Sequence, residues 1–217
     1  MRFRKVYKTF VKRFIDIFLS LIGIIVLIPI FVIVGIVIYL DDLGPVFFKQ
    51  RRVGKDKSTF WLHKFRSMKI KTPDIPTHML DNPEQYITRV GKIIRKLSID
   101  ELPQVYDILI GKMSIIGPRP ALWNQDDLIA ERDKYGVNDV RPGLTGWAQI
   151  NGRDELPIDV KAKLDGEYVD KLNQGGFTAF FMDCKCFVGT ILSVLKSDGV
   201  VEGGTGTLDK QKEVSVE

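Results

Sequence analysis

Cysteine and histidine are scarce in this sequence, with 2 of each among 217 residues. Cys184 and Cys186 lie two positions apart in an apolar segment, where helical side chains point in different directions, so no disulfide is expected between them. His63 and His78 are remote from any cysteine, which argues against a zinc site. Free thiols are typical of a protein in a reducing cytoplasm.

A basic surface spread over a domain is also missing. The chain has 32 basic and 27 acidic residues, a net charge of +5, and residues 1–16 alone account for that difference. A nucleic-acid-binding domain would distribute its positive charge over a broad surface, so we expect no nucleic-acid partner. The length suits one domain with a substantial core.

Only one long hydrophobic run occurs, from Ile17 to Leu40, and it contains no charged residue. As a helix it would reach about 36 Å, enough to cross the hydrocarbon layer of a membrane. Pro29 lies in its middle, and basic clusters flank it at residues 2–13 and 49–57. The positive-inside tendency would keep both ends in the cytoplasm. A helix that enters, bends near Pro29 and returns satisfies both features, and a simple span is the alternative.

Lys12, Arg13 and Asp16 stand directly before this run. On a helix, spacings of four and three residues let Asp16 pair with either cation. We interpret the group as an anchor at the membrane interface rather than as catalytic machinery.

Asp100 and Glu101 form a pair of adjacent carboxylates before a predicted helix that begins near Pro103. Acidic residues are favoured at this positive end of a helix, and Ser98 with Glu101 fits a capping box. The same position would keep a carboxylate ionised as a nucleophile or metal ligand, beside N–H groups that attract phosphate. The local sequence leaves both interpretations open.

Residues 44–54 and 60–68 predict two strands of a hairpin. Alternation along the second strand would place Lys64 and Arg66 on one face. These cations are either solvated charges or phosphate contacts, and the spacing does not separate the two.

Three later segments have helical patterns. Residues 84–97 predict a basic amphipathic helix that includes Arg95 and suits either a membrane surface or an ordinary core. Residues 157–172 predict a second amphipathic helix. Residues 177–195 are strongly apolar but carry Asp183 near their centre, which favours a buried or interfacial helix over a second span.

Two loops present arginine in a rigid setting. Prolines on both sides of Arg119 would fix a guanidinium for bidentate recognition of a phosphate. The segment 141–153 begins with Arg141, ends with Arg153 and contains Gln149 and three glycines, which let backbone approach a ligand closely. Either loop could instead be a tight structural turn.

Taken in order, these motifs resemble the bacterial sugar transferase family, the small monotopic phosphoglycosyl transferases that start glycan assembly on a polyprenol carrier. The resemblance covers roughly residues 8–200, and the short chain resembles minimal members typified by the bacillosamine phosphate transferase of bacterial N-glycosylation. The motifs that carry it are Lys12-Arg13-x-x-Asp16, the apolar run with Pro29, Lys64-Phe65-Arg66-Ser67-Met68, Asp100-Glu101-Leu102-Pro103-Gln104, Gly117-Pro118-Arg119-Pro120 and Arg141-Pro142-Gly143-Leu144-Thr145-Gly146-Trp147.

The resemblance implies transfer of a sugar 1-phosphate from a UDP-sugar to polyprenol phosphate, giving polyprenol diphosphate sugar and UMP. Asp100 would attack the β-phosphorus and carry the phosphosugar, and Glu101 would assist through Mg²⁺ or through proton handling. Both carboxylates are therefore candidate ligands of a Mg²⁺ cofactor. The implied phosphate and nucleotide contacts are Lys64, Arg66, Arg95, Arg119, Arg141, Gln149 and Arg153.

The family also implies an unusual α/β fold, in which a re-entrant membrane helix hairpin precedes a small cytoplasmic α/β domain with amphipathic membrane-surface helices. We accordingly divide the chain into a basic segment and re-entrant helix (1–43), a catalytic domain (44–198) and a flexible tail (199–217). The expected location is the cytoplasmic face of the bacterial inner membrane, in contact with its lipids. Neither the sugar nor the presence of a homodimer can be read from the sequence.

Two other functions fit part of the pattern. A membrane-anchored scaffold could bind polyanions through the arginine loops, with Asp100 and Glu101 acting only as a helix cap. A metal-dependent hydrolase of nucleotide sugars would release free sugar phosphate without any need for polyprenol phosphate.

Overall fold

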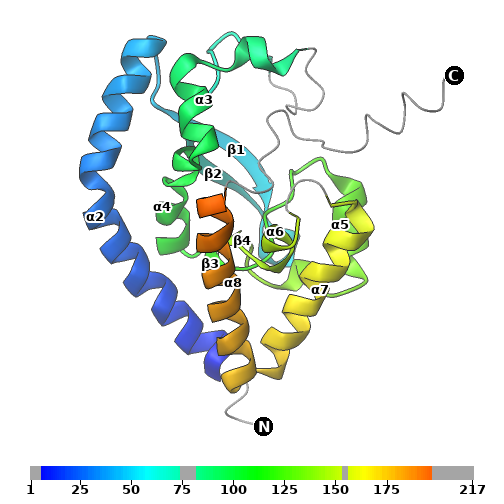
Figure 1. The fold of residues 1–217 in the computed structure, drawn as a ribbon. Helices are drawn as coiled ribbons and strands as arrows, with labels where there is room; N and C mark the ends of the chain where they lie inside the picture. The colour runs from blue at the N-terminus through cyan, green and yellow to red at the C-terminus, as the bar shows by residue number, and fades with distance from the viewer. Residues whose placement is uncertain (1–5, 74–81, 153–155, 197–217) are drawn as a thin grey trace, which may run out of the picture.

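The computed structural model of this chain describes residues 6–73, 82–152 and 156–196. Figure 1 shows the long N-terminal helix along one side of the molecule and the small sheets in the middle, with α8 (Gly176–Lys196) in front of them and α7 (Ile158–Gln174) on the side away from the N-terminal helix. The fold is thus a mixed α/β arrangement with an apolar N-terminal helix, as expected. The predicted tail over 199–217 lies outside the described residues.

The N-terminal helix α2 (Lys12–Asp41) follows a π-helical turn, η1 (Tyr7–Val11). Helix α2 passes through Pro29 without ending there, and Figure 1 shows it bending around the rest of the molecule. The expected hairpin turn at Pro29 is therefore not confirmed. Within the described part of the chain, two helical segments are long and apolar enough to cross a membrane, namely Tyr7–Asp41 and Gly176–Ser193.

The charged residues at the start of α2 bond to distant parts of the chain. Asp16 is buried and accepts hydrogen bonds from the Ser114 hydroxyl (3.1 Å) and the Ile115 amide (2.9 Å). Arg13 donates to two carbonyls at the end of helix α4 (Gln104–Leu109), and Lys12 pairs with Asp183 at 2.8 Å. The predicted pairing of Asp16 with its helical neighbours is wrong, because the strand β3 offers it better-placed donors.

The two sheets have two strands each. Strand β1 (Phe47–Val53) pairs antiparallel with β2 (Thr59–Phe65), and the turn η2 (Lys55–Lys57) connects them, which confirms the predicted hairpin. Strand β3 (Ser114–Ile116) pairs parallel with β4 (Gly143–Thr145).

Close backbone contact explains a glycine in this second sheet. A side chain on Gly143 would collide with the backbone of Gly117, so the crossing at the end of β3 requires glycine. The prediction that glycines in 141–153 admit a ligand is corrected at this position, because the neighbour is backbone of the chain itself.

The predicted helix over 84–97 begins later than expected. Residues Pro83–Tyr86 form the 3₁₀ turn η4, and Ile87 makes a bridge with Met68. Helix α3 (Arg89–Lys96) then follows the N-cap residue Thr88, whose hydroxyl accepts a hydrogen bond from the Gly91 amide at 2.9 Å. A capping threonine and a strand-like contact together override the helical periodicity of the first five residues.

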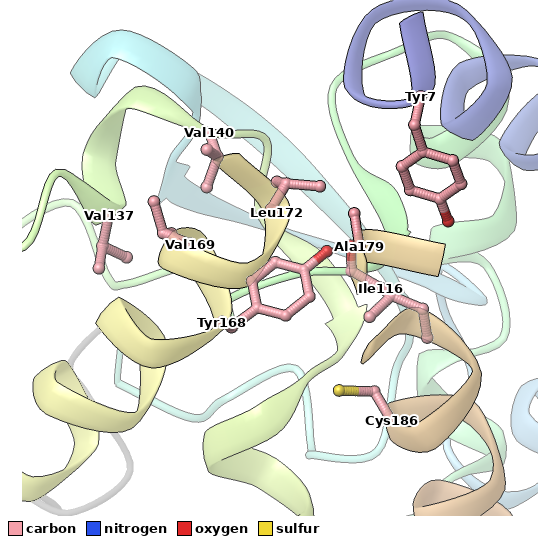
Figure 2. Packing of buried hydrophobic residues seen from close by; sticks show 9 residues of the cluster. All are labelled: Tyr7, Ile116, Val137, Val140, Tyr168, Val169, Leu172, Ala179 and Cys186. Atoms are coloured by element: carbon pink, nitrogen blue, oxygen red, sulfur yellow. Dashed lines mark hydrogen bonds between the residues drawn. The ribbon is translucent and has the colours of Figure 1, made fainter. Parts of the chain in front are cut away.

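The later helices enclose a core beside the second sheet. Figure 2 shows Tyr168 and Leu172 of α7 near Ile116 of β3, with Ala179 and Cys186 of α8 in the same cluster. Buried Asp183 in α8 accepts hydrogen bonds from the hydroxyls of Tyr168 (2.8 Å) and Tyr7 (2.7 Å). The remaining elements are the helices α5 (Asp126–Asp133), α6 (Trp147–Ile150), α7 (Ile158–Gln174) and α8 (Gly176–Lys196) and the turns η5 (Ile99–Glu101) and η6 (Val137–Asp139).

A buried ion pair ties α5 to α7. Arg132 donates two hydrogen bonds to Asp165, at 3.0 and 2.5 Å, and a third to the carbonyl of Arg119 at 2.9 Å. Both side chains of the pair are almost fully buried. The pair therefore also fixes the backbone of the loop that follows β3.

Replacing Arg132 by methionine should destabilise the protein by about 3 kcal/mol, since it leaves a buried carboxylate without its partner. The midpoint of urea unfolding of the detergent-solubilised protein measures this loss. Lys134→Met provides the control, because Lys134 and its partner Glu131 form an ion pair with an exposed lysine, and such pairs add little stability. Equal midpoints for the two variants would contradict the assigned role of Arg132.

Candidate functional site

The adjacent carboxylates lie in a short 3₁₀ turn, η5 (Ile99–Glu101), between α3 and α4 (Gln104–Leu109). Ser98 has a positive φ of 55° and makes no capping hydrogen bond through its side chain, so the capping-box interpretation is wrong. Asp100 and Glu101 are both buried, at 9% and 8% exposure. Burial of two neighbouring carboxylates needs compensation by positive charge.

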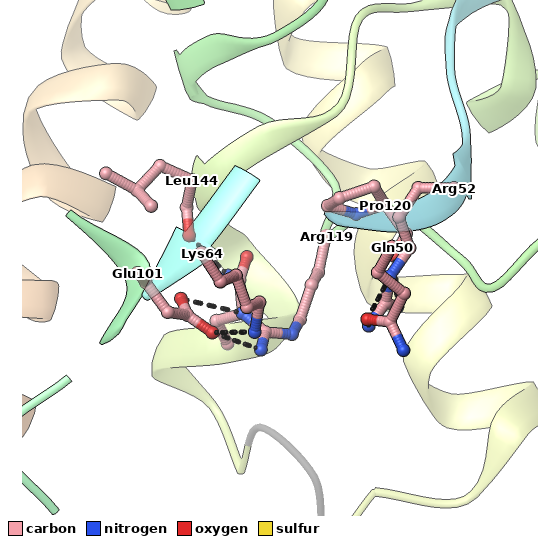
Figure 3. Close-up of polar contacts among 8 residues, drawn as sticks. Gln50, Arg52, Lys64, Glu101, Arg119, Pro120 and Leu144 are labelled. Atoms are coloured by element: carbon pink, nitrogen blue, oxygen red, sulfur yellow. Dashed lines mark hydrogen bonds and ion pairs between the residues drawn. The ribbon is translucent and has the colours of Figure 1, made fainter. Parts of the chain in front are cut away.

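Glu101 receives that compensation directly. Arg119 donates to its Oε1 at 2.6 Å and to its Oε2 at 3.2 Å, and Lys64 Nζ donates to Oε1 at 3.0 Å. Figure 3 shows these three side chains converging from η5, from β2 and from the loop after β3. Three separate parts of the chain thus meet at one carboxylate.

The two cations determine the ionisation of Glu101. Burial alone would raise the pKa of Glu101, but the charges and hydrogen bonds of Arg119 and Lys64 hold this pKa well below its usual range. Burial lowers the pKa of Lys64, and the charge of Glu101 opposes this effect. We therefore treat Glu101 as a permanently charged carboxylate that holds two cations in place.

Asp100 differs from its neighbour. Among the described residues, none donates a hydrogen bond to its carboxylate. Burial raises the pKa of Asp100, Lys64 lowers it and Glu101 raises it, with smaller lowering effects from Arg95 and Arg119. Asp100 is thus a more basic carboxylate, surrounded by positive charge and available to a ligand.

Further polar contacts position β2 beside the carboxylates. Asp107 of α4 is fully buried and accepts hydrogen bonds from the backbone amide of His63 (2.9 Å) and from its Nδ1 (2.7 Å). Lys64 is the next residue along β2. The contact between Asp107 and His63, which holds β2 in place, could not be predicted from the sequence pattern, because the two residues lie 44 positions apart.

The structure separates several of the predicted phosphate contacts from the carboxylates. Arg66 lies beyond the end of β2, where it is buried and bonds to Asp42 at the end of α2, through the backbone carbonyl and through the carboxylate at 3.3 Å. The predicted shared face of Lys64 and Arg66 is therefore wrong. Arg66 connects the end of α2 to β2.

The predicted residues in 141–153 have other contacts. Arg141 donates to the carbonyl of Gly111 at 3.1 Å, at the end of α4, and Gln149 donates to the carbonyl of Leu144 at 2.9 Å. Arg153 lies outside the described residues. Of the predicted contacts, Lys64 and Arg119 touch Glu101, and Arg95 acts on Asp100 through its charge.

The sequence analysis also missed Gln50 and Arg52 of β1. Arg52 donates to Gln50 at 2.6 and 3.1 Å and to the carbonyl of Pro120 at 3.0 Å. Alternation along β1 places both side chains on one face, and the register puts them opposite Leu62 and Phe60. The alternating pattern of β1 could have placed Gln50 and Arg52 on one face of the hairpin. Only the strand register shows that this face also carries Lys64.

Asp100 and Glu101 are the candidate ligands of a divalent cation. Within the described part of the chain, no group of three or more Asp, Glu, His or Cys residues could enclose a metal ion. Mg²⁺ is commonly held by one or two carboxylates together with substrate phosphates and water. Asp100 fits this mode, whereas both oxygens of Glu101 already accept hydrogen bonds from cations.

Comparison with known proteins places this arrangement in a family. Residues 7–197 match the family described as bacterial sugar transferase. The chain is 41% identical over 167 residues to the uncharacterized sugar transferase EpsL of Bacillus subtilis, covering 77% of this chain and 78% of EpsL.

Two longer relatives have names that state an activity. The chain is 38% identical over 162 residues to the UDP-N-acetylgalactosamine-undecaprenyl-phosphate N-acetylgalactosaminephosphotransferase of Aeromonas hydrophila, covering 73% of this chain and 38% of that protein. It is 36% identical over 165 residues to the UDP-glucose:undecaprenyl-phosphate glucose-1-phosphate transferase of Escherichia coli, covering 73% of this chain and 36% of that protein. The match over 7–197, which includes every element described above, shows that this chain belongs to the bacterial sugar transferase family.

Proposed function

We propose that this chain transfers a sugar 1-phosphate from a UDP-sugar to polyprenol phosphate, through a phosphosugar carried on Asp100. The observation that carries the proposal is the unequal environment of the two carboxylates. Glu101 is held by Arg119 and Lys64, whereas the Asp100 carboxylate accepts no hydrogen bond from the described residues. The relatives named for transfer of a sugar phosphate to undecaprenyl phosphate support the same reaction class.

In the first step, a carboxylate oxygen of Asp100 attacks the β-phosphorus of the UDP-sugar. A bond from this oxygen to phosphorus forms, the bond from phosphorus to the bridging oxygen breaks, and UMP leaves with the electron pair. The raised pKa of Asp100 makes its carboxylate more basic and hence a better nucleophile. Lys64 and Arg119 stand ready to stabilise the charge on the phosphoryl oxygens.

In the second step, an oxygen of polyprenol phosphate attacks the phosphorus held by Asp100. The products are polyprenol diphosphate sugar and the free carboxylate, so Asp100 is restored without any net proton transfer. Glu101 serves throughout as the fixed anion that keeps Lys64 and Arg119 in place.

We also propose Mg²⁺ as the cofactor, with Asp100 and the substrate diphosphate as its ligands. When bound, the ion would withdraw charge from the phosphate oxygens. Glu101 Oε1 already accepts from both Arg119 and Lys64, whereas Oε2 accepts only from Arg119, so Glu101 would join as a ligand through Oε2.

We place the protein on the cytoplasmic face of the bacterial inner membrane, with α2 as a re-entrant element whose two ends stay in the cytoplasm. Support comes from the contacts at both ends of α2 with the same small domain. Asp16 bonds to β3 near one end, and Asp41 accepts the Val90 amide at 3.0 Å at the other. A helix that crossed the bilayer once would carry its two ends to opposite faces.

Exposed apolar side chains accompany this placement. Ile93 and Leu97 at α3 are 60% and 55% exposed, beside basic residues that suit anionic lipids. Helix α8 exposes Phe177 and Phe181. This face of α8 would contact either the bilayer or a second copy of the chain in a homodimer.

Asp100→Asn should abolish adduct formation and reduce turnover by about a thousandfold or more, because an amide cannot replace the nucleophile. Intact-protein mass spectrometry after incubation with Mg²⁺ and a panel of UDP-sugars, without lipid acceptor, detects the added phosphosugar. Asp126→Asn, an exposed change on α5, should leave both unchanged. Full activity of Asp100→Asn would reject Asp100 as the nucleophile. Absence of both adduct and turnover in the unchanged protein would favour the scaffold, and turnover independent of polyprenol phosphate would favour the hydrolase.

The first step should also depend on pH in a defined direction. The reaction needs the Asp100 carboxylate, and burial raises its pKa above the ordinary value of 3.8, so the rate should fall on acidification before an ordinary aspartate would protonate. Glu101→Gln removes a charge that raises this pKa, and should move the acid limb to lower pH while reducing the maximal rate. Stopped-flow rates of UMP release across pH measure both effects, and an acid limb that moves to higher pH would refute this assignment.

A further inference from the structure

Arg52 is held rigidly beside the carboxylate site. Gln50 accepts hydrogen bonds from its Nε (3.1 Å) and Nη2 (2.6 Å), while the Pro120 carbonyl accepts from its Nη1 (3.0 Å). Such a fork from one amide oxygen fixes the plane of the guanidinium as well as its position. Gln50 and Pro120 therefore hold the Arg52 guanidinium in one orientation.

The position of Arg52 follows from its neighbours. Pro120 comes directly after Arg119, and alternation puts Arg52 on the same face of the hairpin as Lys64. In Figure 3, Arg119 lies between Glu101 on one side and the Gln50 and Arg52 pair on the other. The charge of Arg52 also helps to lower the pKa of Lys64, which agrees with this proximity.

The geometry of phosphoryl transfer suggests which phosphate Arg52 could bind. In a displacement at phosphorus, the attacking and leaving oxygens lie roughly in line on opposite sides. If Asp100 attacks from one side, the UMP phosphate departs on the other. The phosphosugar then remains on Asp100, so the lipid phosphate must approach from the side that UMP has vacated.

We propose that Arg52 forms a single phosphate subsite, which holds first the phosphate of departing UMP and then the phosphate of the incoming polyprenol phosphate. The inference rests on the proposed function and specifies how one site serves a soluble and a lipid substrate. Lys64 and Arg119 act on the transferred β-phosphate, and Arg52 acts on the phosphate opposite Asp100. Gln50 is a positioning residue that acts through Arg52.

The bonds formed and broken balance both for discharge of the Asp100 adduct by polyprenol phosphate and for its reversal by UMP. Discharge by polyprenol phosphate forms a bond between its phosphate oxygen and phosphorus and breaks the bond to Asp100, which recovers the electron pair. UMP can attack the same phosphorus and regenerate the UDP-sugar. Both acceptors are phosphate monoesters, and the shared chemistry is what Arg52 would recognise.

The test measures discharge of the preformed adduct by UMP and, in a separate arm, by polyprenol phosphate, using full-length detergent-solubilised protein with Mg²⁺. Arg52→Gln should raise the half-saturating concentration about tenfold or more for both acceptors, because each loses a charge-assisted hydrogen bond. Arg51→Gln is the matched control, since Arg51 lies on the opposite face of β1, over the ring of Trp123. It should change either concentration less than twofold.

Two further variants separate binding from folding. Half-saturating concentrations do not depend on the fraction of folded protein, and Arg52→Lys should give an intermediate value because it keeps the charge but loses the fork. Gln50→Leu should weaken both acceptors and add little to Arg52→Gln, as expected of a residue that acts through Arg52.

The result that overturns the inference is distinct from failure of the proposed function. If Arg52→Gln weakens only one acceptor, or neither, the shared subsite is wrong while the transferase remains. If the wild-type protein forms no adduct with any UDP-sugar, the aspartyl mechanism and the subsite are both rejected.

Discussion

The pairing of Glu101 with Lys64 and Arg119 is the interaction on which the rest of the site depends. It joins a turn, a strand and a loop that are far apart in the sequence, and it does so with buried charges. A buried anion between two cations has a strict geometric requirement, because loss of any partner leaves charge without compensation. Because Lys64 and Arg119 bond to Glu101, Asp100 is not needed to hold them in place. One carboxylate organises the site, and its neighbour remains open for chemistry.

Further contacts position the segments that carry Lys64 and Arg119. Asp107 fixes the strand that carries Lys64, by accepting from the residue just before it. Arg132, paired with Asp165, holds the backbone carbonyl of Arg119. Helix α2 contributes too, since Asp16 bonds to β3, which leads into the loop of Arg119. The orientation of Lys64 and Arg119 thus depends on contacts from the core and from α2.

Local patterns predicted the elements better than the contacts between them. Alternation identified the hairpin of β1 and β2, and apolar periodicity identified α7, because both signals act between near neighbours. The partners of Asp16 lie 98 and 99 residues away, and no spacing rule reaches so far. Arg66 looked equivalent to Lys64, but the strand ends between them and Asp42 captures the arginine. The motif order singled out Asp100 and Glu101 as a pair, whereas the difference in their hydrogen bonding is visible only in the folded chain.

The most direct measurement identifies the residue that carries the phosphosugar after the protein has reacted with the UDP-sugar. Hydroxylamine converts an acyl phosphate to a stable hydroxamate, and peptide mass spectrometry then identifies the modified residue. The account predicts a hydroxamate at Asp100 and none at Glu101, because Arg119 and Lys64 already engage both Glu101 oxygens. Modification of Glu101, or of another carboxylate with Asp100 unmodified, would contradict the division of roles between the two residues.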